Sequence, residues 1–248
     1  MSSRAFCAVL VVFVGVFMLT SCQAWKKTRQ TWQERIYSKQ VELNEDSGLS
    51  ASEEEAAKGF AKVDQDLYEL LQELQVQEDP PAEGWAGQMQ EAHPWLQGLM
   101  VMDREGEELQ STSSRELPED MLQDVLELEQ EWQEQGLRLL LRSEQDQDWM
   151  IIVRPYHQGL KWQGLILAYF KPRDLLQGSE SPGQIILLGQ EQVLWSGDYP
   201  KAAEEALELD LHSRLEDQAY GQLQAAGQEF FWLARYVGQD QFFYLLAK

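Results

Sequence analysis

The carboxy-terminal two thirds of the chain alternate short apolar runs with turn residues, and this pattern constrains the fold most. The segment 103–106 (Asp-Arg-Glu-Gly) and the segment 157–159 (His-Gln-Gly) each separate two apolar runs. Loops this short join antiparallel neighbours and cannot carry the chain to a parallel one. Strands are expected at 95–102, 107–111, 137–142, 149–156 and 160–170. The pattern predicts an α+β fold in which antiparallel sheet is covered by helices packed on one face.

A long helix is expected to precede these strands. Ser52 and Glu55 have the capping-box spacing, and Pro80 and Pro81 end the segment. Apolar residues follow at three- and four-residue steps, which places them on one side of the helix: Phe60, Val63, Leu67, Leu70, Leu71 and Leu74. This stripe has to be buried, against the sheet or against a partner protein. A further helix is expected from Pro118 to Gly136, with Met121 and Val125 on its apolar face.

The order of elements partly recurs after Phe170. Strands are expected at 184–188 and 193–196, a helix at 201–226 that includes Tyr220 or Leu223, and a hairpin of 229–237 with 241–247. Two sheet units in tandem, or one larger sheet, both agree with this recurrence. The predicted organisation is a signal peptide at 1–21, a lipidated tether with a short helix at 22–51, a long helix with a first sheet unit at 52–177, and a second, smaller unit or a continuation of the same sheet at 178–248.

The amino terminus has the features of an export signal. Arg4 precedes an apolar run at 5–19, which is shorter than the ~20 residues of a membrane-spanning helix but suits a signal-peptide core. The sequence Leu19-Thr20-Ser21-Cys22 that follows resembles the lipobox of bacterial lipoproteins. The resemblance implies cleavage before Cys22, diacylglycerol joined to its sulfur with acyl chains such as palmitate, and a mature chain attached to a membrane outside the cytoplasm.

Two other interpretations of this segment stay open. One is an ordinary secretory cut after Ala24, and the other is an uncleaved anchor, although Lys26 and Lys27 on the far side of the run oppose the usual charge rule. Gln23 is not the Asp that typically retains lipoproteins at an inner membrane. In a host with two membranes, the resemblance therefore implies the outer membrane, facing the periplasm.

Cysteine usage and charge exclude several classes of function. Of the 2 cysteines, Cys7 leaves with the signal peptide and Cys22 carries lipid, so none remains for a disulfide, a metal or catalysis. The net charge is −22, and −23 without Arg4. Nucleic-acid binding depends on cations that neutralise phosphates, so nucleic acid is not an expected partner.

The sequence contains no pattern typical of an enzyme or of a metal protein. His93, His157 and His212 are far apart, so no metal-ligand spacing occurs, and each histidine is expected at the surface or as a cap. No nucleophile elbow and no phosphate-binding glycine loop is present. We therefore expect a non-enzymatic protein without a cofactor.

The order of elements is similar to that of the extracytoplasmic Cache sensor domains, relatives of the PAS fold. The similarity covers about 52–176 and, as a double Cache domain, the remainder. It is carried by the long helix, the strand Leu99–Asp103 with Gly106 in its turn, the next helix, Val153-Arg154-Pro155-Tyr156, and Gly164 to Phe170. It implies a pocket over the sheet for a small molecule such as an amino acid or a carboxylate. By this resemblance the candidate ligand-binding residues are Arg142, Trp149, Arg154 and Tyr156.

The sequence also departs from that family. It has no Arg-x-Trp pair followed by Tyr, and no Asp in the strand that ends at Phe170, which separates it from the amino-acid-binding pattern. The transmembrane helix and signalling module that follow a Cache domain in a receptor are not found after it. A signal would therefore have to pass through a partner protein.

Two functions of different class are consistent with the sequence. The first is a membrane-anchored, extracytoplasmic module that senses or binds a small molecule. The second is a structural or assembly lipoprotein that docks another envelope protein through its amphipathic helix and its aromatic strands, Phe230-Phe231-Trp232 and Phe242-Phe243-Tyr244. Complete burial of those six rings in the folded protein would weaken the second hypothesis.

Overall fold

A computed structural model describes residues 51–76, 81–113, 117–127, 136–144, 147–159, 161–209, 211 and 219–248. These residues belong to one compact unit that begins at Asp46. The predicted signal peptide, Cys22, the tether and its short helix lie outside the described residues. None of the described helices combines the length and the apolar character needed to cross a bilayer.

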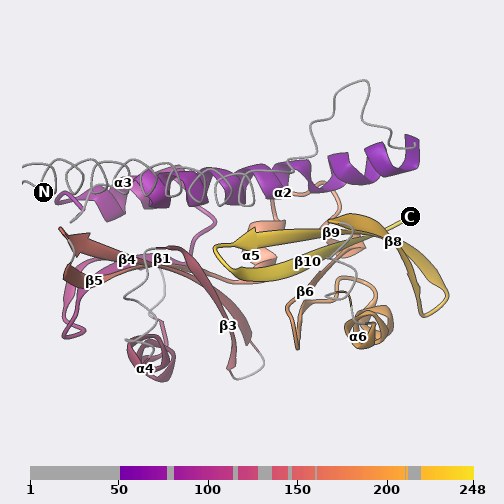
Figure 1. The fold of residues 1–248 in the computed structure, drawn as a ribbon. Coiled ribbons are helices and arrows are strands. Elements are labelled where there is room, and N and C mark those ends of the chain that lie inside the picture. The colour runs from indigo at the N-terminus through magenta and orange to yellow at the C-terminus, as the bar shows by residue number, and fades with distance from the viewer. Residues whose placement is uncertain are drawn as a thin grey trace, which may run out of the picture. The chain divides into compact units, whose positions relative to one another are not determined.

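The described chain forms two antiparallel sheets of five strands each (Figure 1). Sheet A has the order β2-β1-β5-β4-β3, and sheet B has the order β7-β6-β10-β9-β8. The strands of sheet A are β1 (Gly98–Asp103), β2 (Glu108–Ser113), β3 (Arg138–Glu144), β4 (Gln147–Gln158) and β5 (Lys161–Phe170). Those of sheet B are β6 (Ile185–Leu188), β7 (Val193–Trp195), β8 (Tyr220–Ala225), β9 (Gln228–Val237) and β10 (Asp240–Ala247). The predicted α+β class with antiparallel sheet is confirmed, and the chain forms two sheets rather than one larger sheet.

The long helix α2 (Ala51–Val76) buries its predicted stripe inside the protein. Phe60, Val63, Leu67, Leu70 and Leu74 are buried and Leu71 packs beside them in the same core as residues of both sheets. The Phe60 ring lies 5.3 Å from the ring of Tyr244 in sheet B. Near the other end, the Glu73 carboxylate lies 3.3 Å from Nε2 of His93, at the end of α3 (Trp85–Ala92). The helix therefore contacts both halves of the fold.

The helices lie on both faces of the sheets rather than on one. Figure 1 shows α2 on one side, and α4 (Glu119–Glu127) and α6 (Pro200–Glu208) on the other. Met121 and Val125 of α4 are buried with sheet A, and Ala202, Ala203 and Ala206 of α6 are buried with sheet B. The physical reason lies in the central strands, which are apolar at successive positions and therefore need cover on both sides. The short helices α5 (Pro172–Leu176) and η2 (Pro182–Gln184) connect the two sheets along the chain.

The helix predicted at 201–226 is wrong in its second part. Helix α6 ends at Glu208, and Tyr220–Ala225 forms strand β8, which pairs with β9. Ala226 and Gly227 both have positive φ, 49° and 78°. Two consecutive residues in that conformation form the tight turn that matches the twist of a hairpin. The turn places Ala225 opposite Gln228 and so pairs β8 with β9. This pairing determines the structure of 220–225, although Leu215 and Leu223 have helical spacing in the sequence.

Candidate ligand-binding site

Alternation along the strands divides sheet A into two apolar faces. Trp149, Ile151 and Val153 of β4 pack with Met121 and Val125 of helix α4. We call this side the α4 face. The intervening residues Met150 and Ile152 pack on the opposite side with the stripe of helix α2, which we call the α2 face. A side chain in β4 therefore reaches one face or the other according to the parity of its number.

The four predicted ligand-binding residues do not share one face. Arg142 of β3 and Trp149 of β4 are opposite each other in the strand register and both belong to the α4 face. Tyr156 belongs to the core of the α2 face, and Arg154, two residues before it, has the same parity. Arg142 and Trp149 can therefore contribute to one site, while Arg154 and Tyr156 cannot join them there.

Tyr156 has a packing role in its place on the α2 face. It is buried, and it lies opposite Gly164 in the strand register. A Cβ on Gly164 would lie 2.7 Å from Oη of Tyr156 and 2.0 Å from the carbonyl oxygen of Met102. The glycine thus makes room for the tyrosine ring and for strand β1 at the same position.

Lys171 joins the α4-face pair, and the sequence analysis missed it. It follows β5, is buried with 4% exposure, and donates a hydrogen bond from Nζ to Oε1 of Gln147. Its Nζ lies 5.1 Å from the centre of the Trp149 ring. A cation in that position is attracted by the ring, and a buried lysine is rare unless its charge is compensated. In the sequence, a lysine before Pro172 is typical of an exposed turn, so no signal indicated its burial.

Arg142 supplies a second cation beside the same tryptophan. Its Nε donates a hydrogen bond of 3.0 Å to Oδ2 of Asp124 on helix α4, and Nη1 donates to the carbonyl oxygen of Leu141. About a third of the Arg142 side chain and half of the Asp124 side chain are exposed. A carboxylate from solvent can reach this guanidinium, and Asp124 is the group with which it would compete.

The Trp149 indole lies below Nζ of Lys171 and opposite Arg142 in the strand register. It is buried, and its ring centre lies 6.1 Å from that of Tyr169, which is also buried. We name Arg142, Trp149 and Lys171, with Gln147 and Asp124 as their polar partners, the cation–tryptophan cluster. Two positive groups beside an aromatic ring suit a small molecule that carries a carboxylate and an apolar part.

The histidines were expected at the surface or as caps. A surface position is wrong for two of them, although His93 is the C-cap residue of α3. His93 and His157 are buried, with 3% and 9% exposure. The imidazole of His93 lies edge-on to Trp95, with ring centres 6.0 Å apart, and beside Glu73 of helix α2. The imidazole of His93 can be buried between α2 and α3 because its apolar edges pack on Trp95 while Nε2 keeps Glu73 as a polar partner. His212 lies outside the described residues, among which no group of three potential metal ligands occurs.

The aromatic strands that the alternative hypothesis offered for docking are buried in sheet B. Phe230, Phe231, Trp232, Phe242, Phe243 and Tyr244 each have an exposure of 0–1%. Alternate rings point to the two faces, where α2 covers one set and α6 the other. These six rings form part of the protein's own core, so none of them is exposed for docking.

A comparison with solved structures identifies the fold. The extracellular domain of the putative histidine kinase vpHK1S-Z8 matches with a TM-score of 0.53 and 12% identity, over 81% of this chain and 96% of that one. The chain therefore shares the fold of that extracellular domain, and the predicted Cache-like fold class is confirmed. No protein-family model matches the sequence, and no curated protein sequence does.

Two further structures match this Cache-like chain at lower TM-scores. An extracellular ligand-binding receptor from Desulfohalobium retbaense matches with a TM-score of 0.48 and 11% identity over 79% of this chain. The chain spans 38% of that receptor's length. The ligand-binding domain of the Pseudomonas aeruginosa amino acid chemoreceptor PctB, in complex with L-Gln, matches with a TM-score of 0.47 and 12% identity, over 80% and 90% of the two chains.

Proposed function

We propose that this protein is an extracytoplasmic module, attached to a membrane by lipid on Cys22, that binds and senses a small carboxylate-bearing molecule without converting it. The cation–tryptophan cluster is the observation that carries this proposal. The Cache-like fold supports it, since the match to the extracellular domain of the putative histidine kinase vpHK1S-Z8 covers 96% of that domain.

The charge of the molecule makes the position of this cluster informative. In a chain with 42 acidic and 20 basic residues, an anionic ligand is repelled unless cations lie at the point of contact. Lys171 and Arg142 supply two such cations on neighbouring parts of one sheet face. Arginine offers a planar pair of donors for a carboxylate.

Thermal unfolding with single compounds tests ligand binding. We expect at least one L-amino acid or short monocarboxylate to raise the unfolding temperature, because a ligand at 100 times its Kd stabilises the folded state by about 2.7 kcal/mol. Arg142→Gln and Lys171→Gln should each weaken that ligand's affinity roughly tenfold or more, as charged hydrogen bonds are lost.

Arg154→Gln is the matched control, because it changes the same residue type on the opposite face of the same sheet. It should alter the affinity less than about twofold, as expected for a side chain without ligand contact. A loss of affinity in Arg154→Gln but not in Arg142→Gln would move the site to the α2 face. The absence of any stabilising compound in the panel would contradict the choice of ligand class.

The lipid anchor is proposed from the sequence around Cys22. Intact mass spectrometry of the protein from the bacterial membrane should show a chain that starts at Cys22 and carries diacylglycerol, and labelled palmitate should be incorporated. Cys22→Ser should abolish both and release the protein from the membrane fraction. An unmodified thiol at Cys22, or a retained Met1, would contradict the anchor and the outer-membrane position that we propose with it.

The proposal that the module is not an enzyme has its own test. The compound that stabilises the protein should be recovered unchanged, by mass spectrometry, after prolonged incubation with it. Conversion of more than one molecule of the compound per protein molecule would show that the protein is an enzyme. The assembly hypothesis receives no support from the aromatic strands, because all six of their rings are buried.

A further inference from the structure

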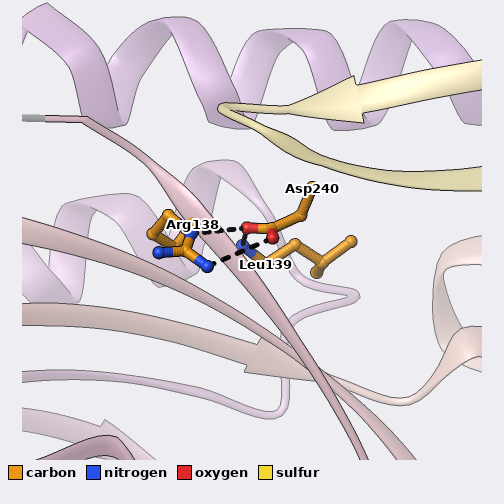
Figure 2. A network of polar contacts seen from close by, with 3 residues as sticks. All are labelled: Arg138, Leu139 and Asp240. Atoms are coloured by element: carbon orange, nitrogen blue, oxygen red, sulfur yellow. Dashed lines mark hydrogen bonds and ion pairs between the residues drawn. The ribbon is translucent and has the colours of Figure 1, made fainter. Parts of the chain in front are cut away.

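The turn between β9 and β10 of sheet B is hydrogen-bonded to the first residues of β3 in sheet A. Asp240, the first residue of β10, accepts hydrogen bonds from Nε of Arg138 at 2.9 Å and from the backbone N–H of Leu139 at 2.7 Å, both on Oδ2 (Figure 2). Nη2 of Arg138 donates to the other oxygen, Oδ1, at 3.4 Å. One carboxylate therefore fixes both a side chain and the backbone of consecutive residues in β3.

The same turn is in close backbone contact with Leu137, the residue before β3. Gly238 has φ +62°, and a Cβ at this position would lie 1.7 Å from the carbonyl oxygen of Leu137. Only a glycine permits this approach. We call Gly238 and Asp240, with Arg138 and Leu139 of β3, the inter-sheet clamp.

Strand β3 is an edge strand of sheet A, and the clamp occupies its open edge. The backbone N–H of Leu139 has no neighbouring strand on that side, because β3 ends the order β2-β1-β5-β4-β3. Further along β3, the side chain of Leu141 lies next to Gly189, the residue that follows β6: a Cβ on Gly189 would lie 2.6 Å from Cδ1 of Leu141. Sheet B and the loop after β6 thus contact β3 at Arg138, Leu139 and Leu141.

The other side of β3 carries part of the cation–tryptophan cluster. Arg142 is one residue beyond Leu141, and its side chain reaches Asp124 on the α4 face. The residues of one strand move together, so a shift of Arg142 on the α4 face also shifts Leu139 and Leu141 on the other face of β3. A ligand that draws Arg142 away from Asp124 therefore acts on the strand that sheet B holds.

We propose that β3 and the inter-sheet clamp form the mechanical link through which a change at Arg142 in sheet A reaches the β9–β10 turn in sheet B. This inference rests on the proposed function only for the role of Arg142 in ligand binding. Helix α2 is the competing route, because it contacts both sheets and is tied to β9 by the ion pair of Asp64 with Arg235.

Hydrogen exchange of the whole chain tests the link without any ligand. Arg142→Ala removes the Asp124 ion pair, and we expect it to change amide exchange at 237–241 by roughly two- to thirtyfold, the range of couplings measured along packed networks. In an Asp240→Ala background the same substitution should leave these amides unchanged within about twofold. Circular dichroism establishes that each variant is folded.

Two control backgrounds separate the clamp from the helix. Arg138→Met removes the guanidinium but keeps the backbone bond of Leu139, so it serves where Asp240→Ala does not fold, and it should reduce the coupling. Asp64→Asn breaks the ion pair of α2 with β9 and should leave the coupling intact. No effect of Arg142→Ala on residues 237–241, an effect that survives Asp240→Ala and Arg138→Met, or an effect abolished by Asp64→Asn would each overturn the link. A protein that binds no compound leaves this result unaffected, so the two failures are distinguishable.

Discussion

Asp64 of helix α2 and Arg235 of strand β9 form a two-pronged ion pair between residues that are 171 positions apart in the sequence. Nη2 of Arg235 donates to Oδ2 of Asp64 at 2.6 Å, and Nε donates to Oδ1. The two side chains are only 19% and 25% exposed. A forked arginine–carboxylate pair fixes geometry as well as charge, so this contact sets the position of the helix on sheet B.

Breaking that pair should destabilise the protein measurably. Arg235→Ala leaves the Asp64 carboxylate largely out of water without its partner, and we expect a loss of roughly 1–3 kcal/mol in the free energy of unfolding. Urea unfolding at neutral pH measures it. Arg104→Ala is the control, because Arg104 pairs with Glu105 and both side chains are more than half exposed, so its loss should cost less than about 0.5 kcal/mol. Equal effects of the two substitutions would refute the special position of Arg235.

The hydroxyl group of Tyr244 is buried without a hydrogen-bond partner among the described residues. Its ring packs against Phe60 and Phe242. A buried polar atom without a partner costs free energy, so Tyr244→Phe should leave stability at pH 7 unchanged or raise it by up to roughly 1–3 kcal/mol. Thermal unfolding measures this change, and a clear loss of stability would show that the hydroxyl has a partner.

Tyr244 also predicts how stability depends on alkaline pH. Burial raises the pKa of Tyr244 above its usual value of 10.0, and the carboxylate of Asp64 adds to the rise. The unfolded chain therefore loses this proton first as the pH passes 10, so the stabilisation is complete below pH 10 and is lost as the pH rises towards the folded-state pKa. Wild type should lose about 1.4 kcal/mol per pH unit more than Tyr244→Phe in that range. Urea titrations of both proteins at pH 9 to 11 measure the difference, and the other tyrosines cancel because both proteins contain them.

The helical stripe and the hairpins could be predicted because their signals are local. The three- and four-residue spacing from Phe60 to Leu74 identified the buried side of α2, and turns such as Asp103 to Gly106 fixed antiparallel pairing. Strand β8 was missed because Leu215 and Leu223 have helical spacing, and the Ala226-Gly227 turn has none of the usual Asn or Asp residues.

The candidate site was only partly predictable, for two different reasons. The parity of residue numbers in β4 already separates Trp149 from Arg154 and Tyr156, so that division was present in the sequence pattern. The burial of Lys171 was not, because it depends on Gln147 and Trp149 of another strand lying beside it. Contacts of this kind arise from tertiary packing, for which the local sequence carries no signal.

The buried stripe of α2 should dominate the helix's contribution to stability. Phe60 is 1% exposed between the rings of Phe231 and Tyr244, so Phe60→Ala should cost roughly 3–5 kcal/mol through lost burial and the cavity left behind. Val76, on the same helix, is 75% exposed, and Val76→Ala should change stability by less than about 0.5 kcal/mol. Urea unfolding compares the two, and a small cost for Phe60→Ala would mean that the helix is loosely packed on sheet B.

Gly238 is needed in the inter-sheet clamp for two reasons, its positive φ and its close approach to Leu137. Substitutions at three glycines measure the two effects separately. Gly136 has an ordinary φ and open space around it, so Gly136→Ala should be neutral or stabilise by up to about 1 kcal/mol through the unfolded chain. Gly159 has φ +66° and open space, so its substitution should cost about 1 kcal/mol for the backbone conformation alone. Gly238 has φ +62° and, in addition, the carbonyl oxygen of Leu137 at 1.7 Å from a Cβ position.

Gly238→Ala should therefore be the most destabilising of the three, with a cost above that of Gly159→Ala by roughly 1–3 kcal/mol, the usual penalty of overpacking. The excess should shrink in an Asp240→Ala background, where the turn is free to move away from β3. Urea unfolding of the three single variants and of the double variant measures both quantities. Equal costs for Gly159→Ala and Gly238→Ala would show that the turn does not press on Leu137, and the clamp would then consist of the carboxylate of Asp240 alone.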